Sequence, residues 1–142
     1  MAVKIPEIRT VVYSGTHTVP PNTSETVFEK TLGLNEKLYI VSLEIPNTPD
    51  DIRIVLLRTL RGAEQELAAF KTQFQPIEFN IPYSNVVTAY KDNENFVNVP
   101  NFGAMGYPEV DFGQKVIIRA SHSLATPQDV NYKLKAILII YR

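Results

Sequence analysis

The residues best suited to catalysis or metal binding are two histidines, His17 and His122, in a chain without cysteine. They stand alone in Gly15-Thr16-His17-Thr18 and Ala120-Ser121-His122-Ser123, so neither forms an H-x-H or H-x-x-x-H pair. A zinc or iron site needs three or four converging ligands, and cysteine is the usual source of thiolate ligands. We therefore expect no metal site, and we expect both histidines to have structural roles.

Ser121 and His122 are the one serine and histidine pair that suggests a hydrolase. A serine nucleophile needs an exposed, strained turn, and the G-x-S-x-G motif is absent. Adjacent residues of a strand point to opposite faces, so these two side chains do not bond each other readily. We predict no catalytic residue and no enzyme activity.

Two loops carry residue types that bind ions or cofactors elsewhere. Asp92-Asn93-Glu94-Asn95 offers the oxygen atoms that calcium prefers, but Phe96 and Val97 interrupt an EF-hand pattern, and a hairpin turn is the simpler interpretation. Gly103-Ala104-Met105-Gly106 lacks the glycine spacing and the lysine of a phosphate-binding loop. The sequence predicts no cofactor.

Aromatic residues gather among asparagines and prolines between Tyr83 and Phe112. Aromatic side chains in polar loops anchor protein partners or stack on sugars. Within Pro100–Pro108 we predict a contact surface formed by Phe102, Met105 and Tyr107. In an alternative interpretation, Tyr83, Tyr90 and Tyr107 supply stacking faces for a sugar. A third possibility is that these rings close the open ends of the domain.

The elements that must position these loops are short strands. The chain has 142 residues and ten prolines, the length of one domain, and its turn residues separate runs with an apolar residue at every second position. In Lys37–Ile45, for example, this period places Tyr39, Val41, Leu43 and Ile45 on one face. We predict one all-β domain over residues 1–142, an antiparallel two-sheet β-sandwich of eight or nine strands: Ile8–Tyr13, Thr26–Leu32, Lys37–Ile45, Ile52–Leu60, Gln65–Phe70, Ile77–Ile81, Val86–Tyr90, Lys115–Ser121 and Val130–Tyr141.

Two segments allow more than one structure. Ala63–Phe74 contains good helix formers, yet a strand that pairs back on Ile52–Leu60 is slightly favoured by its β-like neighbours. Met1–Thr10 contains Pro6 and mixed charges, and we expect it to form an extended arm that reaches a neighbouring molecule.

The composition of the chain limits the classes of binding partner that we expect. Fourteen Lys and Arg residues against fifteen Asp and Glu residues give a net charge of −1, without the basic excess that nucleic acid attracts. The longest apolar run, Ala136–Tyr141, is far shorter than the ~20 residues of a membrane-spanning helix, and the amino terminus lacks the apolar stretch of a signal peptide. We therefore predict no nucleic acid and no membrane partner, and a cytoplasmic location unless the protein belongs to a virion.

The pattern resembles the small β-sandwich and jelly-roll structural proteins of virus particles, including capsid and capsid-decorating subunits of phages. The turn and strand at Thr16–Val27 and the closing strand Val130–Arg142 carry this resemblance, as part of the strand order over the whole chain. It implies a jelly roll that acts as a non-enzymatic structural subunit, assembles with itself into a trimer or larger ring, and contacts other shell proteins. It assigns no functional residue.

A carbohydrate-binding or adhesin-like module is the alternative function, with a glycan as the partner and Tyr83, Tyr90 and Tyr107 at the site. The absence of tryptophan, the largest stacking ring, weighs against it. A β-barrel enzyme comes third because its acids and histidines form no recognisable cluster. The two leading hypotheses differ in the mass expected in solution, an oligomer for the first and a monomer for the second.

Overall fold

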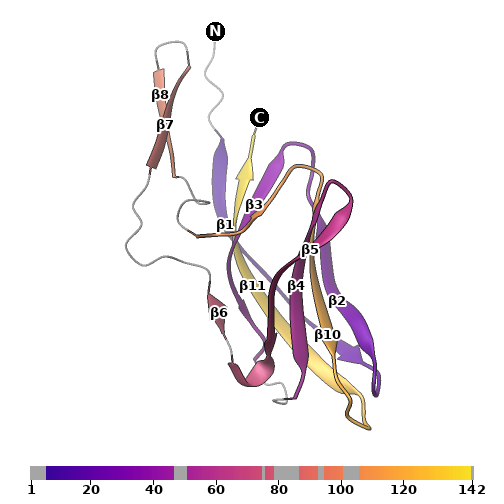
Figure 1. The fold of residues 1–142 in the computed structure, drawn as a ribbon. Coiled ribbons are helices and arrows are strands. Elements are labelled where there is room, and N and C mark those ends of the chain that lie inside the picture. The colour runs from indigo at the N-terminus through magenta and orange to yellow at the C-terminus, as the bar shows by residue number, and fades with distance from the viewer. Residues whose placement is uncertain are drawn as a thin grey trace.

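The residues that the computed structural model describes form eleven strands and one short helix (Figure 1). The structure describes residues 6–46, 51–74, 76–78, 87–92, 95–100 and 106–141, with only the backbone for 74, 87–92 and 95–100. The strands are β1 (Glu7–Val19), β2 (Ser24–Thr31), β3 (Glu36–Glu44), β4 (Arg53–Leu60), β5 (Ala63–Lys71), β6 (Ile77–Glu78), β7 (Val87–Asp92), β8 (Asn95–Pro100), β9 (Glu109–Val110), β10 (Lys115–Ser121) and β11 (Gln128–Ile140), and a 3-10 helix spans Thr72–Phe74.

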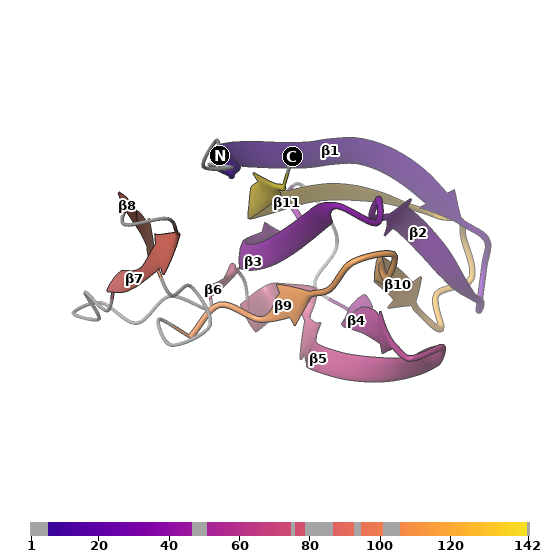
Figure 2. The same cartoon turned by 90° about the horizontal axis from the view of Figure 1, so that it is seen from above.

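The eleven strands divide into a five-stranded sheet, a four-stranded sheet and a separate two-stranded hairpin, and all neighbours are antiparallel. Sheet A has the order β1-β11-β3-β6, and β9 pairs with the same edge of β3 as β6. Sheet B has the order β2-β10-β4-β5. The third sheet contains only β7 and β8. Figure 2 shows sheets A and B as two facing layers.

This order is that of a jelly roll, because the chain crosses between the sheets at each step from β1 to β4, from β5 to β6 and from β9 to β11, and the last strand returns beside the first. The exception within sheet B is the β4–β5 hairpin. β1 pairs with β11 along its full length, from Glu7 opposite Ile140 to Val19 opposite Gln128. The predicted all-β, antiparallel, two-sheet sandwich of the jelly-roll type is therefore confirmed.

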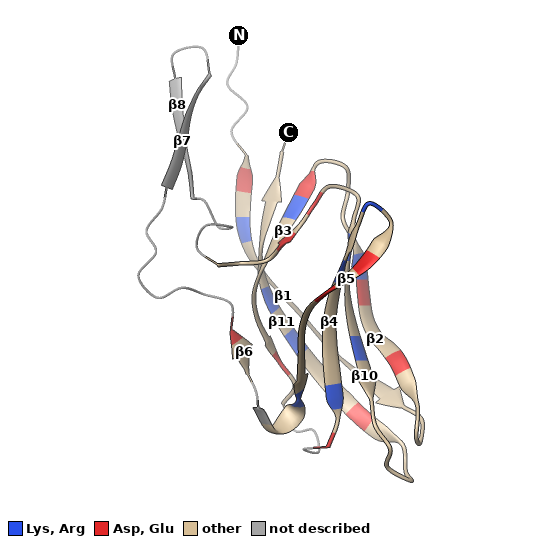
Figure 3. Ribbon diagram, viewed as in Figure 1, with Lys and Arg blue, Asp and Glu red and all other residues tan. Residues whose placement is uncertain are grey.

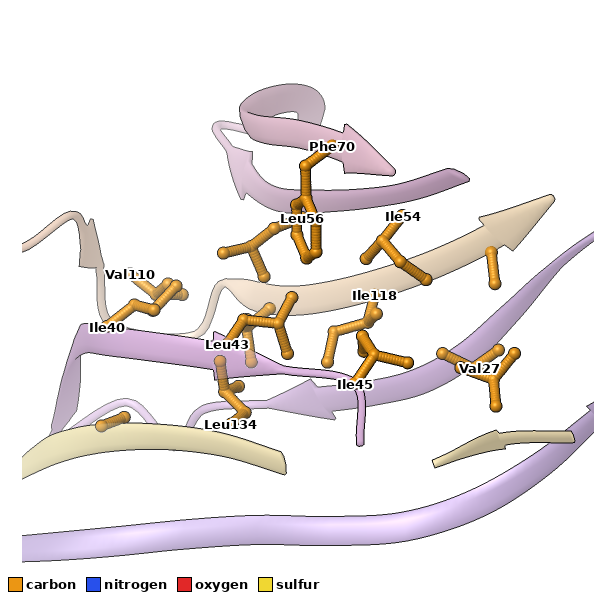
Figure 4. Packing of buried hydrophobic residues seen from close by; sticks show 14 of the residues in the cluster. Val27, Ile40, Leu43, Ile45, Ile54, Leu56, Phe70, Val110, Ile118 and Leu134 are labelled. Carbon is orange, nitrogen blue, oxygen red and sulfur yellow. The ribbon is translucent and has the colours of Figure 1, made fainter. Parts of the chain in front are cut away.

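The core lies between sheets A and B, where inward side chains of both layers interdigitate (Figure 4). Sheet A contributes Ile40, Leu43 and Leu134, and sheet B contributes Ile54 and Ile118, each with no exposed surface. Burying one such side chain stabilises the fold by roughly 1.5–3 kcal/mol relative to leaving it in water. The alternation of apolar and polar residues in the sequence therefore arises because each sheet buries one face.

A β-bulge corrects the predicted face of one strand. The strict period of two places Val41 with Leu43, but the register of β3 against β11 shifts between Ile40 and Ser42. Val41 is the extra residue, so Leu38 and Ile40 point into the core before the bulge, and Leu43 and Ile45 point into it afterwards.

The edge strand of sheet A beyond β3 is formed by two separate short pieces. Glu78 of β6 lies opposite Ser42, and Glu109 of β9 lies opposite Tyr39. Only two positions of β3, Ile40 and Val41, therefore lie between the partners of Glu78 and Glu109, whereas residues 79–108 separate these two glutamates in the chain. The β7–β8 hairpin belongs to this insertion, with Asp92 opposite Asn95, which agrees with the predicted turn at Asp92–Asn95.

Several boundaries differ from the predicted ones. The predicted first strand ends at Tyr13, whereas β1 continues to Val19. Residues 7–10 of the expected extended arm belong to β1 and pair with β11. Residues 1–5 lie outside the described residues. Ala63–Lys71 is a strand, as favoured, followed by the 3-10 helix. The sequence did not indicate β8 or β9. β9 has two residues and owes its assignment to its pairing with β3.

Candidate functional site

The predicted contact and stacking residues all fall in or beside the insertion. Phe102, Met105 and Tyr83 lie outside the described residues, and Tyr90 is described only as backbone in β7. Tyr107 is half-buried and lines a shallow hollow of about 300 Å³. The other residues that line this hollow are Val41, Ser42, Glu78 and Lys135.

The two histidines have hydrogen-bonding roles, as expected. His122 is buried, its Nδ1 accepts from the Leu124 backbone N–H at 3.1 Å, and its Nε2 lies 3.2 Å from the Val19 carbonyl oxygen. Because Nδ1 is the acceptor, Nε2 carries the proton and donates to Val19. Nε2 of His17 in β1 lies 2.9 Å from Oε2 of Glu25 in β2, and this contact links the edge strand of sheet A to the edge strand of sheet B. Within the described residues, no three metal-ligating side chains converge.

A polar cluster secures the chain where it returns from the insertion. The Tyr39 hydroxyl donates to Glu109 Oε2 at 2.8 Å, and Arg58 Nη1 donates to the Glu109 carbonyl oxygen at 2.5 Å. Lys37 Nζ lies 3.6 Å from Glu109 and 5.0 Å from the centre of the Phe112 ring. Partial burial and the hydrogen bond to Glu109 raise the pKa of Tyr39, which keeps this hydroxyl neutral. Since the members satisfy one another, we assign this cluster a structural role.

The outer face of sheet B is crossed by an ion pair. Arg119 of β10 makes a two-pronged contact with Glu64 of β5, in which Nη1 lies 2.7 Å from Oε1. β4 lies between those strands, so the pair spans it. Leu57 and Ile117 point to this same face by register, yet they are only 7% and 3% exposed. The outer face of sheet B is therefore largely closed by its own side chains.

The outer face of sheet A differs, because apolar side chains remain exposed beside its free edge. Ile8, Thr10 and Val12 alternate along β1 on this face, and Ile137 of β11 lies opposite Thr10. Ile8 is 42% exposed and Val12 is 50% exposed. We call these four residues the β1 surface.

β1 is also an edge strand whose backbone can accept another strand. It pairs with β11 on one side and with no described strand on the other. Half of its N–H and C=O groups therefore point away from the sheet. Natural edges are usually protected by charge, proline or short length. After Glu7 and Arg9, the run Thr10–Val19 contains no proline and no Asp, Glu, Lys or Arg, and the charged positions of β1 gather at its start (Figure 3).

The other described edges of sheets A and B have such protection. β2 carries Glu25, Glu29 and Lys30, and β5 carries Glu64, Glu66 and Lys71. The remaining edge consists of β6 and β9, each of two residues. The unprotected β1 edge was missed at the sequence level, although the uncharged run Thr10–Val19 was the signal that could have revealed it.

Helices contribute little to the described part of the chain, and none there has the length and apolar character needed to span a membrane.

Comparisons with known proteins find similarity at the level of architecture. No family model matches the sequence, and no curated relative matches it. Among solved structures, the mitogen derived from Yersinia pseudotuberculosis is 20% identical and aligns over 93% of this chain and 86% of its own, with a TM-score of 0.38. Two structures of infectious bursal disease virus, a VP2 subviral particle and the Gx strain, are 11% and 13% identical and cover 96% of this chain, each with a TM-score of 0.42.

This chain spans 32% of each of those two viral chains, about a third of their length. What the chain shares with these structures is a weak resemblance in β architecture.

Proposed function

We propose that this protein is a non-enzymatic structural subunit that assembles with copies of itself through the β1 edge, as a capsid or capsid-associated protein in a virion. The observation that carries the proposal is an unprotected edge strand directly beside exposed apolar side chains. Jelly rolls also serve as lectins and enzymes, so the fold by itself selects none of these functions.

Two properties of the β1 surface support self-association. A second strand laid along β1 would pair the outward backbone groups, which is the most direct way to satisfy them away from water. The same contact would remove Ile8 and Val12 from water, at about 25 cal/mol for each Å² of apolar area buried. Two copies that pair antiparallel through one strand are related by a twofold axis, so the contact is self-complementary.

Such pairs would be one contact of a larger assembly. A closed shell needs at least one further contact between subunits, and the predicted surface at Phe102, Met105 and Tyr107 is our proposal for it. Trimers or larger rings, together with other shell proteins, would then use the two surfaces in combination.

The test is the mass of the purified protein, measured by light scattering coupled to size exclusion over a range of protein and salt concentrations. The wild type is expected to form dimers or larger species, while Val12→Glu is expected to shift the population to monomer. The new carboxylate lies opposite Lys135, so the monomer should keep its fold.

Leu34→Glu is the matched control, because Leu34 is 87% exposed and lies off the β1 surface. It should assemble like the wild type. A wild type that is monomeric at all concentrations would rule out self-assembly, and a Val12→Glu variant that assembles like the control would exclude the β1 surface.

A further inference from the structure

A polar hollow of about 600 Å³ lies at the end of sheet B where β4 and β2 begin and where β10 and β5 end. Its volume lies in the range of small-molecule sites. Side chains with hydroxyl, amide and charged groups dominate its lining, which consists of Asn22, Thr23, Ser24, Asp51, Arg53, Lys71, Ser121, His122, Ser123 and Leu124.

Four of these residues form one row across the sheet. Ser24 lies opposite Ser121, Ser121 lies opposite Arg53, and Arg53 lies opposite Lys71. Neighbouring strands are about 4.8 Å apart, so two hydroxyls and two cations follow each other in a line at that spacing. Like charges directly opposite each other destabilise an antiparallel pair. The Arg53 and Lys71 pair is therefore a local cost that the fold itself does not explain.

The charges in this row are only weakly compensated. Arg53 Nη2 lies 4.0 Å from Glu66 Oε1, and both side chains are more than half exposed. Within the described part of the chain, the Lys71 ammonium has no acidic partner, and the hydroxyls of Ser24 and Ser121 have no hydrogen-bond partner. Asp51 is the one described acid that lines the hollow, against two cations.

Backbone hydrogen bonds fix the walls around the row. On one side, the Asn22 N–H donates to the Leu124 carbonyl oxygen at 3.1 Å, and the His122 N–H donates to the Thr23 carbonyl oxygen at 3.2 Å. On the other side, the Thr72 N–H donates to the Ile52 carbonyl oxygen at 3.0 Å. The buried His122 ring ties the first wall to β1 through Val19. Because the walls are held in place, a ligand would bind a preorganised surface and lose less entropy in ordering it.

We propose that this hollow binds an oxyanion, a sulfate or phosphate group, with Arg53 and Lys71 as the charged donors and Ser24 and Ser121 as the hydroxyl donors. Guanidinium and ammonium groups are the side chains that recognise such groups, and hydroxyls complete their hydrogen bonding. The group could be a free ion or an ester carried on a sugar, whose hydroxyls would meet Thr23, Ser123 and Asn22. This proposal does not depend on the proposed assembly.

The experiment is an NMR titration of the full-length protein with sodium sulfate, glucose 6-sulfate and glucose, at constant ionic strength set by sodium chloride. We expect amide shifts at residues of the row with both sulfates and none with glucose. A sugar-borne group as the natural form predicts at least tenfold tighter binding of glucose 6-sulfate than of sulfate. Equal affinities would identify the free ion as the source.

Lys71→Gln should weaken binding of the sulfates about tenfold, because a charge-assisted hydrogen bond is lost. It should not lower the melting temperature, since it also removes a like-charge contact. Arg53→Gln is the second variant, and Lys133→Gln on the outer face of sheet A is the matched control. Absence of binding by the wild type would overturn the proposal. So would binding that Lys71→Gln and Arg53→Gln leave unchanged, which would mean an adventitious ion only.

Discussion

The contact between Arg119 and Glu64 is the best-formed ion pair on the surface of sheet B. The guanidinium hydrogen bonds lower the pKa of the Glu64 carboxyl below its ordinary value of 4.5, and the carboxylate raises the pKa of Arg119. A group whose pKa is lowered by folding stabilises the folded state above the ordinary pKa. That stabilisation is lost as the pH falls through the lowered value.

Glu64→Gln should therefore be less stable than the wild type at neutral pH, and the difference should shrink in acid. Urea unfolding at pH 7 and pH 3 measures it. Glu66→Gln, two residues along β5, is the control, because its contact with Arg53 is longer at 4.0 Å. A difference between wild type and Glu64→Gln that stays constant with pH would show that the charge is not the cause.

The hydrogen bond of Tyr39 should make the stability of the protein fall at alkaline pH, whereas the ion pair of Glu64 loses its effect in acid. Partial burial, followed by the hydrogen bond to Glu109, raises its pKa above the ordinary value of 10.0. An unfolded chain would ionise this tyrosine first, so stability should fall as the pH rises above about 10. Tyr39→Phe should cost about 0.5–1.5 kcal/mol at pH 7 from the lost hydrogen bond, and the difference from wild type should shrink above pH 10. Urea unfolding at pH 7 and pH 10.5 would measure both effects, and a difference that is the same at the two pH values would contradict the assignment.

The residues of the candidate sites could be predicted only where their role depends on neighbours in the sequence. The isolation of His17 and His122 could be read from their neighbours in the chain. The row formed by Arg53 and Lys71 could not, because these residues meet only through the register of β4 and β5. A single sequence gives no register between strands, so sites formed across neighbouring strands cannot be recognised from it.

At the scale of the elements, β1 is held by an aromatic side chain that covers a glycine. Gly15 lies opposite Tyr132. The centres of the Tyr132 and Phe28 rings are 5.2 Å apart, and the Phe28 ring stacks on the ring of Tyr13. A Cβ at Gly15 would lie 2.6 Å from the Tyr132 hydroxyl oxygen. The ring therefore occupies the space above the glycine, an arrangement that compensates for a missing side chain in an edge strand.

Gly15→Ala should destabilise the protein by about 1–3 kcal/mol, because the aromatic row must shift to admit the methyl group. Ser14→Ala, at the neighbouring exposed position, should change stability little. Chemical denaturation of both variants measures this. Equal stability of Gly15→Ala and the wild type would mean that the Tyr132 ring moves without cost.

This contact also explains why the predicted first strand was too short. A glycine within a run usually weakens a strand, so the sequence alone gives no reason to continue the predicted strand Ile8–Tyr13 through Gly15. Tyr132 lies more than a hundred positions away, and its compensation is a tertiary effect. By contrast, the strands with one continuous apolar face, such as β10 and β11, could be predicted closely, since burial against the opposite sheet produces the alternation directly.

At the scale of the whole molecule, the jelly roll is interrupted at one edge and nowhere else among the described strands of sheets A and B. β6 and β9 pair with the same edge of β3, at Ser42 and at Tyr39. A continuous edge strand would need only two residues between Glu78 and Glu109 to face Val41 and Ile40. The sandwich therefore does not require the insertion of residues 79–108 to complete its strand order.

A variant in which two threonines replace residues 79–108 should fold into the same sandwich, with a melting temperature close to that of the wild type. It loses the hydrogen bond from the Ile40 N–H to the Pro108 carbonyl oxygen, which the continuous strand can replace. The mass of this variant separates the two proposed contact surfaces. If the β1 surface drives pairing, dimers should persist and Val12→Glu should still dissociate them. If the surface at Phe102, Met105 and Tyr107 drives assembly alone, the variant should be monomeric, and the β1 contact would be excluded.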